Sequence, residues 1–182
     1  MAVKKILLLG NPALRSKCIP VKNSSSKSTR AIIQNLRDTL DDFRLRHSFG
    51  RGIAAPQIGS AVRIIFIRLN ELGTLINPKI TKRSKKKFTL WDDCFSFPGI
   101  LVGVRRHEWV EVSYRDETGA MKKLRATNGL SELLQHEIDH INGILAVDRA
   151  ISTKHIILRS EMRPVAKCDP CLDFNRLIFY FA

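Results

Sequence analysis

The chain has 182 residues and a formal net charge of +14, so we expect a single domain over residues 1–182 with a sizeable core. The excess of cations favours polyanionic partners, namely RNA, DNA, the ribosome or an acidic membrane surface. The longest apolar runs, such as residues 6–9 and 64–67, are far too short to cross a bilayer, which excludes a transmembrane protein. Because no clear targeting segment is visible, we expect a cytoplasmic monomer, with an organelle as the alternative location.

The predicted elements do not alternate regularly along the chain. Apolar residues at helical spacing predict an amphipathic helix over residues 29–46. A second helix is predicted at residues 130–142, with Gly143 as its natural C-cap. Strands are predicted at residues 62–69, 73–80, 85–91, 109–116, 121–124 and 176–182. This order favours an α+β fold with a mostly antiparallel sheet and a C-terminal strand.

The densest basic run is KRSKKK, at residues 82–87. We interpret it as a solvated hairpin loop, with a contact to ribosomal RNA as the alternative. The four cysteines are expected to be reduced, because the chain is large and carries no secretory signal. Two of them, Cys168 and Cys171, form a lone CDPC, which is a weak indication of a metal or redox site.

The strongest motif is HEIDH, at residues 136–140 in the second predicted helix. At about 100° per residue, His136 and His140 lie about 40° apart on one face, so their imidazoles can converge on one point. Two imidazoles and a third ligand make an open tetrahedral metal site with a position left for water. Glu137 is close enough to take a proton from that water. The alternative is that both histidines are structural or surface residues.

The third ligand is expected upstream of the histidines. Many zinc peptidases with this motif have a third His or Glu downstream, but here no His occurs before His155 and no Glu before Glu161. Cys94, in WDDCFSFPG, is the obvious donor, because thiolates and imidazoles bind many of the same cations.

Three short segments occur in an order that resembles the peptide deformylases. GRGIAAPQIG at residues 50–59 matches the family motif GxGxAAxQxG, DDCFS at residues 92–96 loosely matches EGCLS, and HEIDH matches HExDH. The likeness covers roughly residues 6–150. It implies antiparallel sheets around a central HExxH helix. It also implies hydrolytic removal of the formyl group from formyl-methionyl nascent peptides, with release of formate.

The resemblance further implies which residues perform the chemistry. Cys94, His136 and His140 would hold one divalent metal, and Glu137 would be the general acid and base. Iron(II) is the expected metal, and zinc, nickel or cobalt can substitute for it.

Seven residues are expected to act on the substrate, and one further residue to organise the site. The Gln57 amide and the Phe95 backbone N–H would stabilise the oxyanion. Gly52 would pair with the peptide backbone, next to Arg51 at the substrate rim. The remaining implied roles are an apolar methionine pocket from Ile53, Leu133 and Phe97, and organisation of the site by Arg106, with Arg105 as the alternative.

Several residues near the predicted metal depart from the family pattern. They are Asp92 in place of Glu, Asp93 in place of Gly, Phe95 in place of Leu, and Arg51 at a position that is usually apolar. Because Asp92 is one methylene shorter than Glu, its bond to a ligand or to an arginine is expected to be longer. Glu132 adds another acid near the site, and these acids are expected to pair with Arg51 and Arg106. We therefore expect an intact metal site with an altered substrate rim.

Two other functions remain as alternatives. A related N-acyl amidase or metallopeptidase would keep the metal and the water and act on a different substrate. A non-catalytic protein of the same fold would bind the ribosome through its basic surface. Glu137 argues against the second alternative, because a scaffold has no need of a general base.

Overall fold

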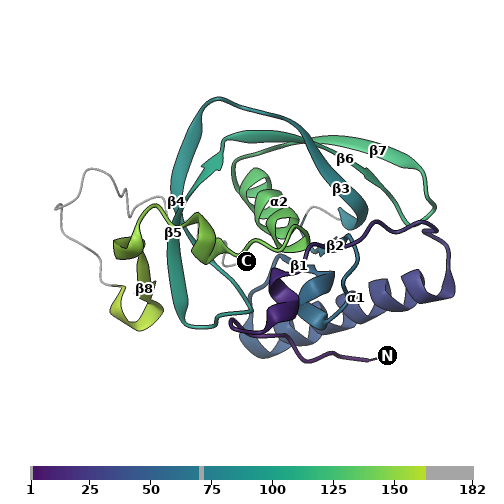
Figure 1. Cartoon of the computed structure of the whole chain (residues 1–182), viewed down its shortest axis with the longest axis horizontal. Helices are drawn as coiled ribbons and strands as arrows, with labels where there is room; N and C mark the ends of the chain where they lie inside the picture. The colour runs from purple at the N-terminus through teal and green to yellow at the C-terminus, as the bar shows by residue number, and fades with distance from the viewer. Residues whose placement is uncertain (1, 70–71, 163–182) are drawn as a thin grey trace.

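The computed structural model describes residues 2–69 and 72–162, and it has an α+β fold in which two longer helices pack against antiparallel sheets (Figure 1). The helices are α1 (Lys27–His47) and α2 (Asn128–Ile141). In these residues the strands are β1 (Gly52–Ala54), β2 (Ile64–Ile67), β3 (Gly73–Arg83), β4 (Lys87–Asp93), β5 (Ile100–His107), β6 (Trp109–Arg115), β7 (Met121–Thr127) and β8 (Ile156–Leu158). No helix in the described ranges is long and apolar enough to cross a membrane.

The strands form two sheets. One has five strands in the order β1-β2-β3-β6-β7, and the other has three in the order β4-β5-β8. All the strand pairs are antiparallel. β1 is an edge strand of the larger sheet, so one side of its backbone faces away from β2.

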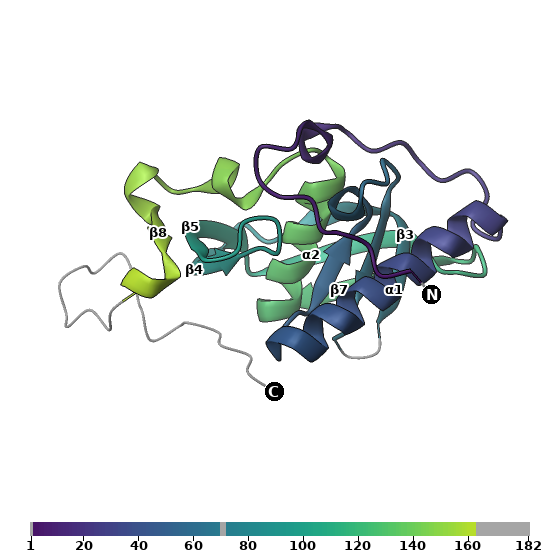
Figure 2. The same ribbon diagram turned by 90° about the horizontal axis from the view of Figure 1, so that it is seen from below.

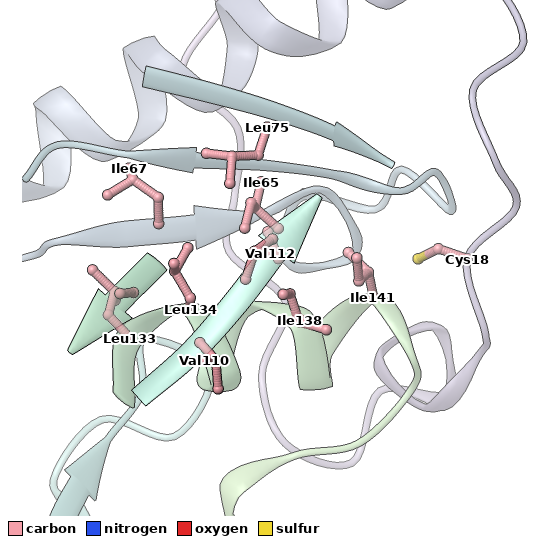
Figure 3. Packing of buried hydrophobic residues seen from close by; sticks show 12 residues of the cluster. Cys18, Ile65, Ile67, Leu75, Val110, Val112, Leu133, Leu134, Ile138 and Ile141 are labelled. Atoms are coloured by element: carbon pink, nitrogen blue, oxygen red, sulfur yellow. The ribbon is translucent and has the colours of Figure 1, made fainter. Parts of the chain in front are cut away.

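Helix α2 lies between the two sheets in both views (Figures 1 and 2). Its apolar residues Leu134, Ile138 and Ile141 pack against alternate residues of the large sheet, such as Ile65 and Val112 (Figure 3). Nearly every residue of α2 is buried, because strands cover it on more than one side. The helix that carries the HEIDH motif is therefore a rigid central element.

Helix α1 covers the opposite face of β1 and β2. Its buried residues Ile33, Leu36 and Leu40 pack against Ile64 and Phe66. The neighbouring β2 residues Ile65 and Ile67 instead point toward α2. Both faces of β2 are thus buried, which explains why its sequence is continuously apolar rather than alternating.

The predicted helices are confirmed, and each differs from the structure by one or two residues at its ends. Strand β5 was not predicted. Its residue Gly103 permits close packing, because a Cβ there would lie 3.0 Å from His155 Cβ, and this glycine interrupts the apolar pattern. The predicted strand at residues 176–182, together with Cys168 and Cys171, lies outside the described residues.

The basic run at residues 82–87 does not form a hairpin loop, contrary to the prediction. β3 pairs with β2 and β6, whereas β4 pairs with β5. The run is therefore the corner where the chain passes from the larger sheet to the smaller one. Ser84 is buried at this corner, and its hydroxyl donates to the Lys86 carbonyl at 2.6 Å. The lysine side chains around it are exposed.

Candidate active site

The end of β4 meets α2 at three potential metal ligands. Cys94 Sγ lies 3.2 Å from His140 Nε2, which in turn lies 3.1 Å from His136 Nε2. All three atoms lie within 4.8 Å of one another, and all three residues are buried. Ligand atoms about 2.0–2.3 Å from a common cation must be spaced this closely. The thiol and the two imidazoles therefore fit a single cation.

Asp92 lies behind one of these ligands. Its Oδ1 atom is 2.8 Å from His136 Nδ1, and its Oδ2 atom accepts a hydrogen bond of 3.0 Å from Arg106 Nη2. Burial alone would raise the pKa of Asp92, but His136 and Arg106 outweigh burial and hold the pKa below its ordinary value. A proton on His136 Nδ1, facing this carboxylate, leaves Nε2 to face the other ligands. The expected lengthening of the Asp92 contacts is wrong, since both distances are ordinary.

Arg106 joins the second motif to α2. It is buried, and its Nη1 donates to Asp139 Oδ2 at 2.5 Å. Arg149 donates to the same carboxylate, with Nη2 2.8 Å from Asp139 Oδ1. Burial would lower the pKa of Arg106, but Asp92 and Asp139 raise it above its ordinary value. Arg106 thus stays charged and clamps β4 to α2, whereas Arg105 is exposed.

The two histidines differ in their electrostatic surroundings. Burial lowers the pKa of His140 well below its ordinary value, and the neighbouring His136 lowers it further. His140 is therefore neutral near pH 7, the form in which imidazole binds a cation. Burial also disfavours the charged form of His136, but Asp92 outweighs burial and raises the pKa well above its ordinary value.

Glu137 is buried next to the ligand cluster. Burial raises the pKa of Glu137 to about 7, with His136 acting in the opposite direction. Among the described residues its Oε2 atom has no hydrogen-bond partner. The Gly52 backbone lies so close to Glu137 that a Cβ at position 52 would be 2.9 Å from Glu137 Oε1. The glycine thus leaves room for a carboxylate whose pKa suits proton transfer near neutral pH.

Gln57 points its amide nitrogen at the same cluster. It lies in the short 3-10 helix Ala55–Ile58 and is buried. Its Oε1 atom accepts from the Ala54 N–H at 2.9 Å. That bond directs Nε2 toward Cys94 Sγ at 3.6 Å and Ser96 Oγ at 3.3 Å. No role was predicted from the sequence for Ser96, whose backbone N–H donates to Cys94 Sγ at 3.4 Å.

A cavity of about 320 Å³ opens next to these residues. Its walls combine two of the candidate metal ligands, Cys94 and His136, with charged and aromatic side chains. The lining residues outside the ligand cluster include His47, Phe49, Arg51, Gly52, Asp93, Phe95, Glu132, Leu133 and Arg159. Neither His47 nor Phe49 was expected here, and Arg159 is distant in sequence. They reach the cavity because α1 ends there and because Arg159 Nη2 donates to Asp93 Oδ2 at 2.5 Å.

Three predicted residues lie away from the cavity lining. Ile53 packs in the cluster under α1. Phe97 packs in a separate cluster with Leu14 and Val102. Arg106 is buried behind Asp92. The structure therefore places Leu133, Phe95 and Phe49, rather than Ile53 and Phe97, at the cavity wall.

The chain is similar to known proteins in its sequence and in its fold. The family model described as "Polypeptide deformylase" matches residues 3–156. The chain is similar to the peptide deformylase of Prochlorococcus marinus, with 39% identity over 158 residues that cover 81% of this chain and 73% of that protein. It is similar to the enzyme of Syntrophomonas wolfei, with 38% identity covering 85% of this chain and 97% of that protein.

Solved structures of the same enzyme also superpose on the chain. The crystal structure of peptide deformylase from Thermotoga maritima has a TM-score of 0.75 at 28% identity, covering 84% of this chain and 100% of that one. The structure of the Synechococcus elongatus enzyme, solved in complex with actinonin, has a TM-score of 0.75 at 34% identity, covering 85% and 86%.

Proposed function

The chain belongs to the polypeptide deformylase family, and from this premise we propose that Cys94, His136 and His140 hold its metal and that Glu137 transfers the proton. The reaction is hydrolytic removal of the formyl group from the N-terminus of nascent peptides. The family implies one divalent metal ion. The observation that carries the proposal is the convergence of one thiol and two imidazoles beside a buried carboxylate.

The proposed cation is iron(II), with zinc, nickel or cobalt as substitutes, because a mixed thiolate and imidazole set suits all of these. When bound, it supplies Lewis-acid polarisation and makes water more acidic. The protein's part is to hold the ligands rigidly. Cys94 Sγ accepts a hydrogen bond from the Ser96 N–H, and His136 lies against Asp92, so neighbouring groups of the protein orient these two ligands.

Glu137 is proposed to move the proton during hydrolysis. As a carboxylate it takes a proton from the attacking water, and as an acid it returns a proton to the leaving amide nitrogen. A pKa of about 7 lets it exist in both forms near neutral pH. The Gln57 amide and the Phe95 backbone N–H are proposed to donate to the oxyanion that forms on the formyl carbon.

The substrate is proposed to bind as an extended strand along β1. That strand is at the edge of its sheet, and Gly52 lines the cavity beside Glu137. Leu133 and Arg51 then contact the first side chain of the peptide. Ile53 and Phe97 are proposed to shape the pocket from behind, and Arg106 to position Asp92 rather than touch substrate.

We also propose that residues 1–182 form one catalytic domain that acts as a cytoplasmic monomer, without membrane contact, close to ribosomal RNA. The larger sheet has an exposed basic face, on the side away from α2. Residues directly opposite each other on paired strands point to the same face of a sheet. The register of β3, β6 and β7 therefore places the following exposed cations on one face: Lys79, Lys82, Arg115, Lys123 and Arg125. Glu111, opposite Lys82 and Arg125, is the acidic residue among these paired positions. The Arg125 guanidinium lies 4.0 Å from the centre of the Trp109 ring.

A direct assay tests the proposed reaction. The metal-loaded protein, prepared without oxygen, is incubated with formyl-Met-Ala-Ser, its acetylated counterpart and an internal peptide. Formate from the first substrate alone is the expected result. Cleavage of the acetylated or internal peptide at a comparable rate would favour an amidase or a peptidase instead.

A further inference from the structure

An ion pair forms part of the cavity wall next to the metal ligands. Arg51, which precedes β1, places Nη2 2.9 Å from Oε2 of Glu132, one helical turn before His136. The Glu132 side chain is 4% exposed and that of Arg51 is 25% exposed. Arg51 Nη1 also lies 3.5 Å from the carbonyl oxygen of Gly129. The pair thus joins the GRGIAAPQIG segment to α2, the helix that carries HEIDH, within the wall of the cavity.

Neither residue of this pair is among the three proposed metal ligands, and neither is the proposed proton carrier. A buried ion pair is weak evidence for stability, because apolar side chains of similar volume often stabilise a fold equally well. We therefore consider what the Arg51–Glu132 pair does for a substrate that binds in the cavity. The Arg51 side chain is partly exposed, and its guanidinium carries five N–H donors, of which Glu132 and the Gly129 carbonyl take only some. It can still donate to a group that enters the cavity.

The geometry brings the first side chain of the peptide to this pair. In the binding mode proposed above, the formyl group lies beside Cys94 and the peptide runs along β1 at Gly52. The adjacent side chain then meets the part of the cavity wall that Arg51, Glu132 and Leu133 form. A purely apolar side chain covers the guanidinium without satisfying its donors. A neutral polar side chain replaces the lost water contacts with hydrogen bonds.

We propose that Arg51 and Glu132 determine specificity for the first residue and admit neutral polar side chains, such as glutamine, as readily as apolar ones. The inference rests on the proposed deformylase reaction and assigns its substrate range. Glutamine offers a carbonyl to Arg51 and an amide to Glu132. Charged first side chains are disfavoured, because a carboxylate meets Glu132 and an ammonium meets Arg51.

The first test uses the unmodified, metal-loaded protein. Its kcat/KM is measured by formate release from formyl-Gln-Ala-Ser and from the formyl-norleucine analogue, which has a similar length and no polar group. We expect the two values to agree within about tenfold. A preference for norleucine of about a hundredfold or more, the range that hydrogen-bonding selectivity can reach, would overturn the proposal. Absence of formate even from formyl-Met-Ala-Ser would instead refute the proposed function.

The second test removes the pair as a unit, so that no buried charge is left alone. Arg51→Met with Glu132→Leu should lower the glutamine-to-norleucine ratio by at least about tenfold. Arg68→Met with Asp41→Leu removes an exposed ion pair elsewhere and should leave the ratio unchanged. An unchanged ratio in the first variant, with metal still bound, contradicts the proposal.

A third variant covers failure of the double variant to fold. Glu132→Gln retains a hydrogen-bonding partner for Arg51 and removes the negative charge. The freed guanidinium charge should then raise kcat/KM for formyl-Glu-Ala-Ser by at least about tenfold. If kcat/KM for formyl-Glu-Ala-Ser does not rise in a folded, metal-loaded Glu132→Gln protein, Arg51 does not contact the first side chain of the substrate.

Discussion

The Asp92 carboxylate lies 2.8 Å from Nδ1 of His136, on the side of the imidazole opposite the ligand cluster. The shorter aspartate reaches this position because it lies near the end of β4, where Asp92 is paired with Val102 of β5. Arg106 on β5 holds the other carboxylate oxygen at 3.0 Å. The backbone therefore supplies the reach that the missing methylene would have given.

Asp92→Ala should weaken metal binding by about 10- to 100-fold, the usual effect of removing a partner behind a metal-bound histidine. The reason is that His136 loses the group that directs its ring. Competition with a chelator measures the affinity. Asp42→Ala, which removes a surface acid paired with Arg46, should leave the affinity unchanged. Equal affinities for both variants would contradict the assigned role.

Glu137→Ala should retain the metal and lose at least about a hundredfold in kcat, the scale of a general acid and base contribution. The carboxylate is not among the three converging ligands, so its removal leaves them in place. Metal content and formate release are measured on the same preparation. If both fall together, Glu137 is a structural residue and not the proton carrier.

Cys94→Ala should abolish tight metal binding. The chain offers a matched control in Cys18, which is also free and buried. Cys18 lies near Arg63 and away from the cluster, and burial raises the pKa of its thiol to about 11. Cys18→Ala should therefore keep full metal occupancy. Full occupancy in Cys94→Ala would remove the thiolate from the ligand set.

Much of the site was predictable because its chemistry is local in sequence. Helical periodicity places His136, Glu137 and His140 together, and the structure confirms a buried helix there. The pairings of Arg51 with Glu132 and of Arg106 with Asp92 were also expected, since isolated charges are rarely buried.

The remaining features depend on contacts between distant segments. Arg159 reaches the cavity because β8, which precedes it, pairs with β5 and because its side chain bonds to Asp93. Short strands such as β8 give little periodic signal. Arg149 joins Asp139 after a turn beyond α2. The displacement of Phe97 from the cavity arises from its packing against Leu14. No local pattern encodes these contacts, so sequence reasoning alone did not find them.

Gly52→Ala should lower activity while metal stays bound. The new Cβ would lie 2.9 Å from Glu137 Oε1 and 2.8 Å from Ile67 Cδ1, so the carboxylate must move. A loss of at least about tenfold in kcat is expected, since small displacements of a catalytic group are costly. Gly103→Ala provides the control, because its Cβ would lie 3.0 Å from His155 Cβ, its three nearest atoms all belong to His155, and Gly103 does not line the cavity. Equal losses in both variants would point to general strain.

Binding to RNA should depend on the basic face of the larger sheet. Replacing Lys79, Lys123 and Arg125 by serine removes three exposed cations from β3 and β7, the two strands that flank β6. Each lost phosphate contact should reduce the slope of log K against log salt by about 0.7–0.9. The measurement is fluorescence polarisation of a labelled ribosomal RNA hairpin over a range of KCl concentrations.

The matched control for this surface replaces Lys4, Lys5 and Lys17 by serine. These three exposed lysines lie in the N-terminal segment, outside the sheet, and the net charge changes by the same amount. The control should retain most of the salt slope, because a located surface binds through its own contacts and not through total charge. If both triple variants show the same fall in RNA affinity and in salt slope, RNA binding depends on the net charge of the protein and not on one surface. The assignment to β3, β6 and β7 is then wrong.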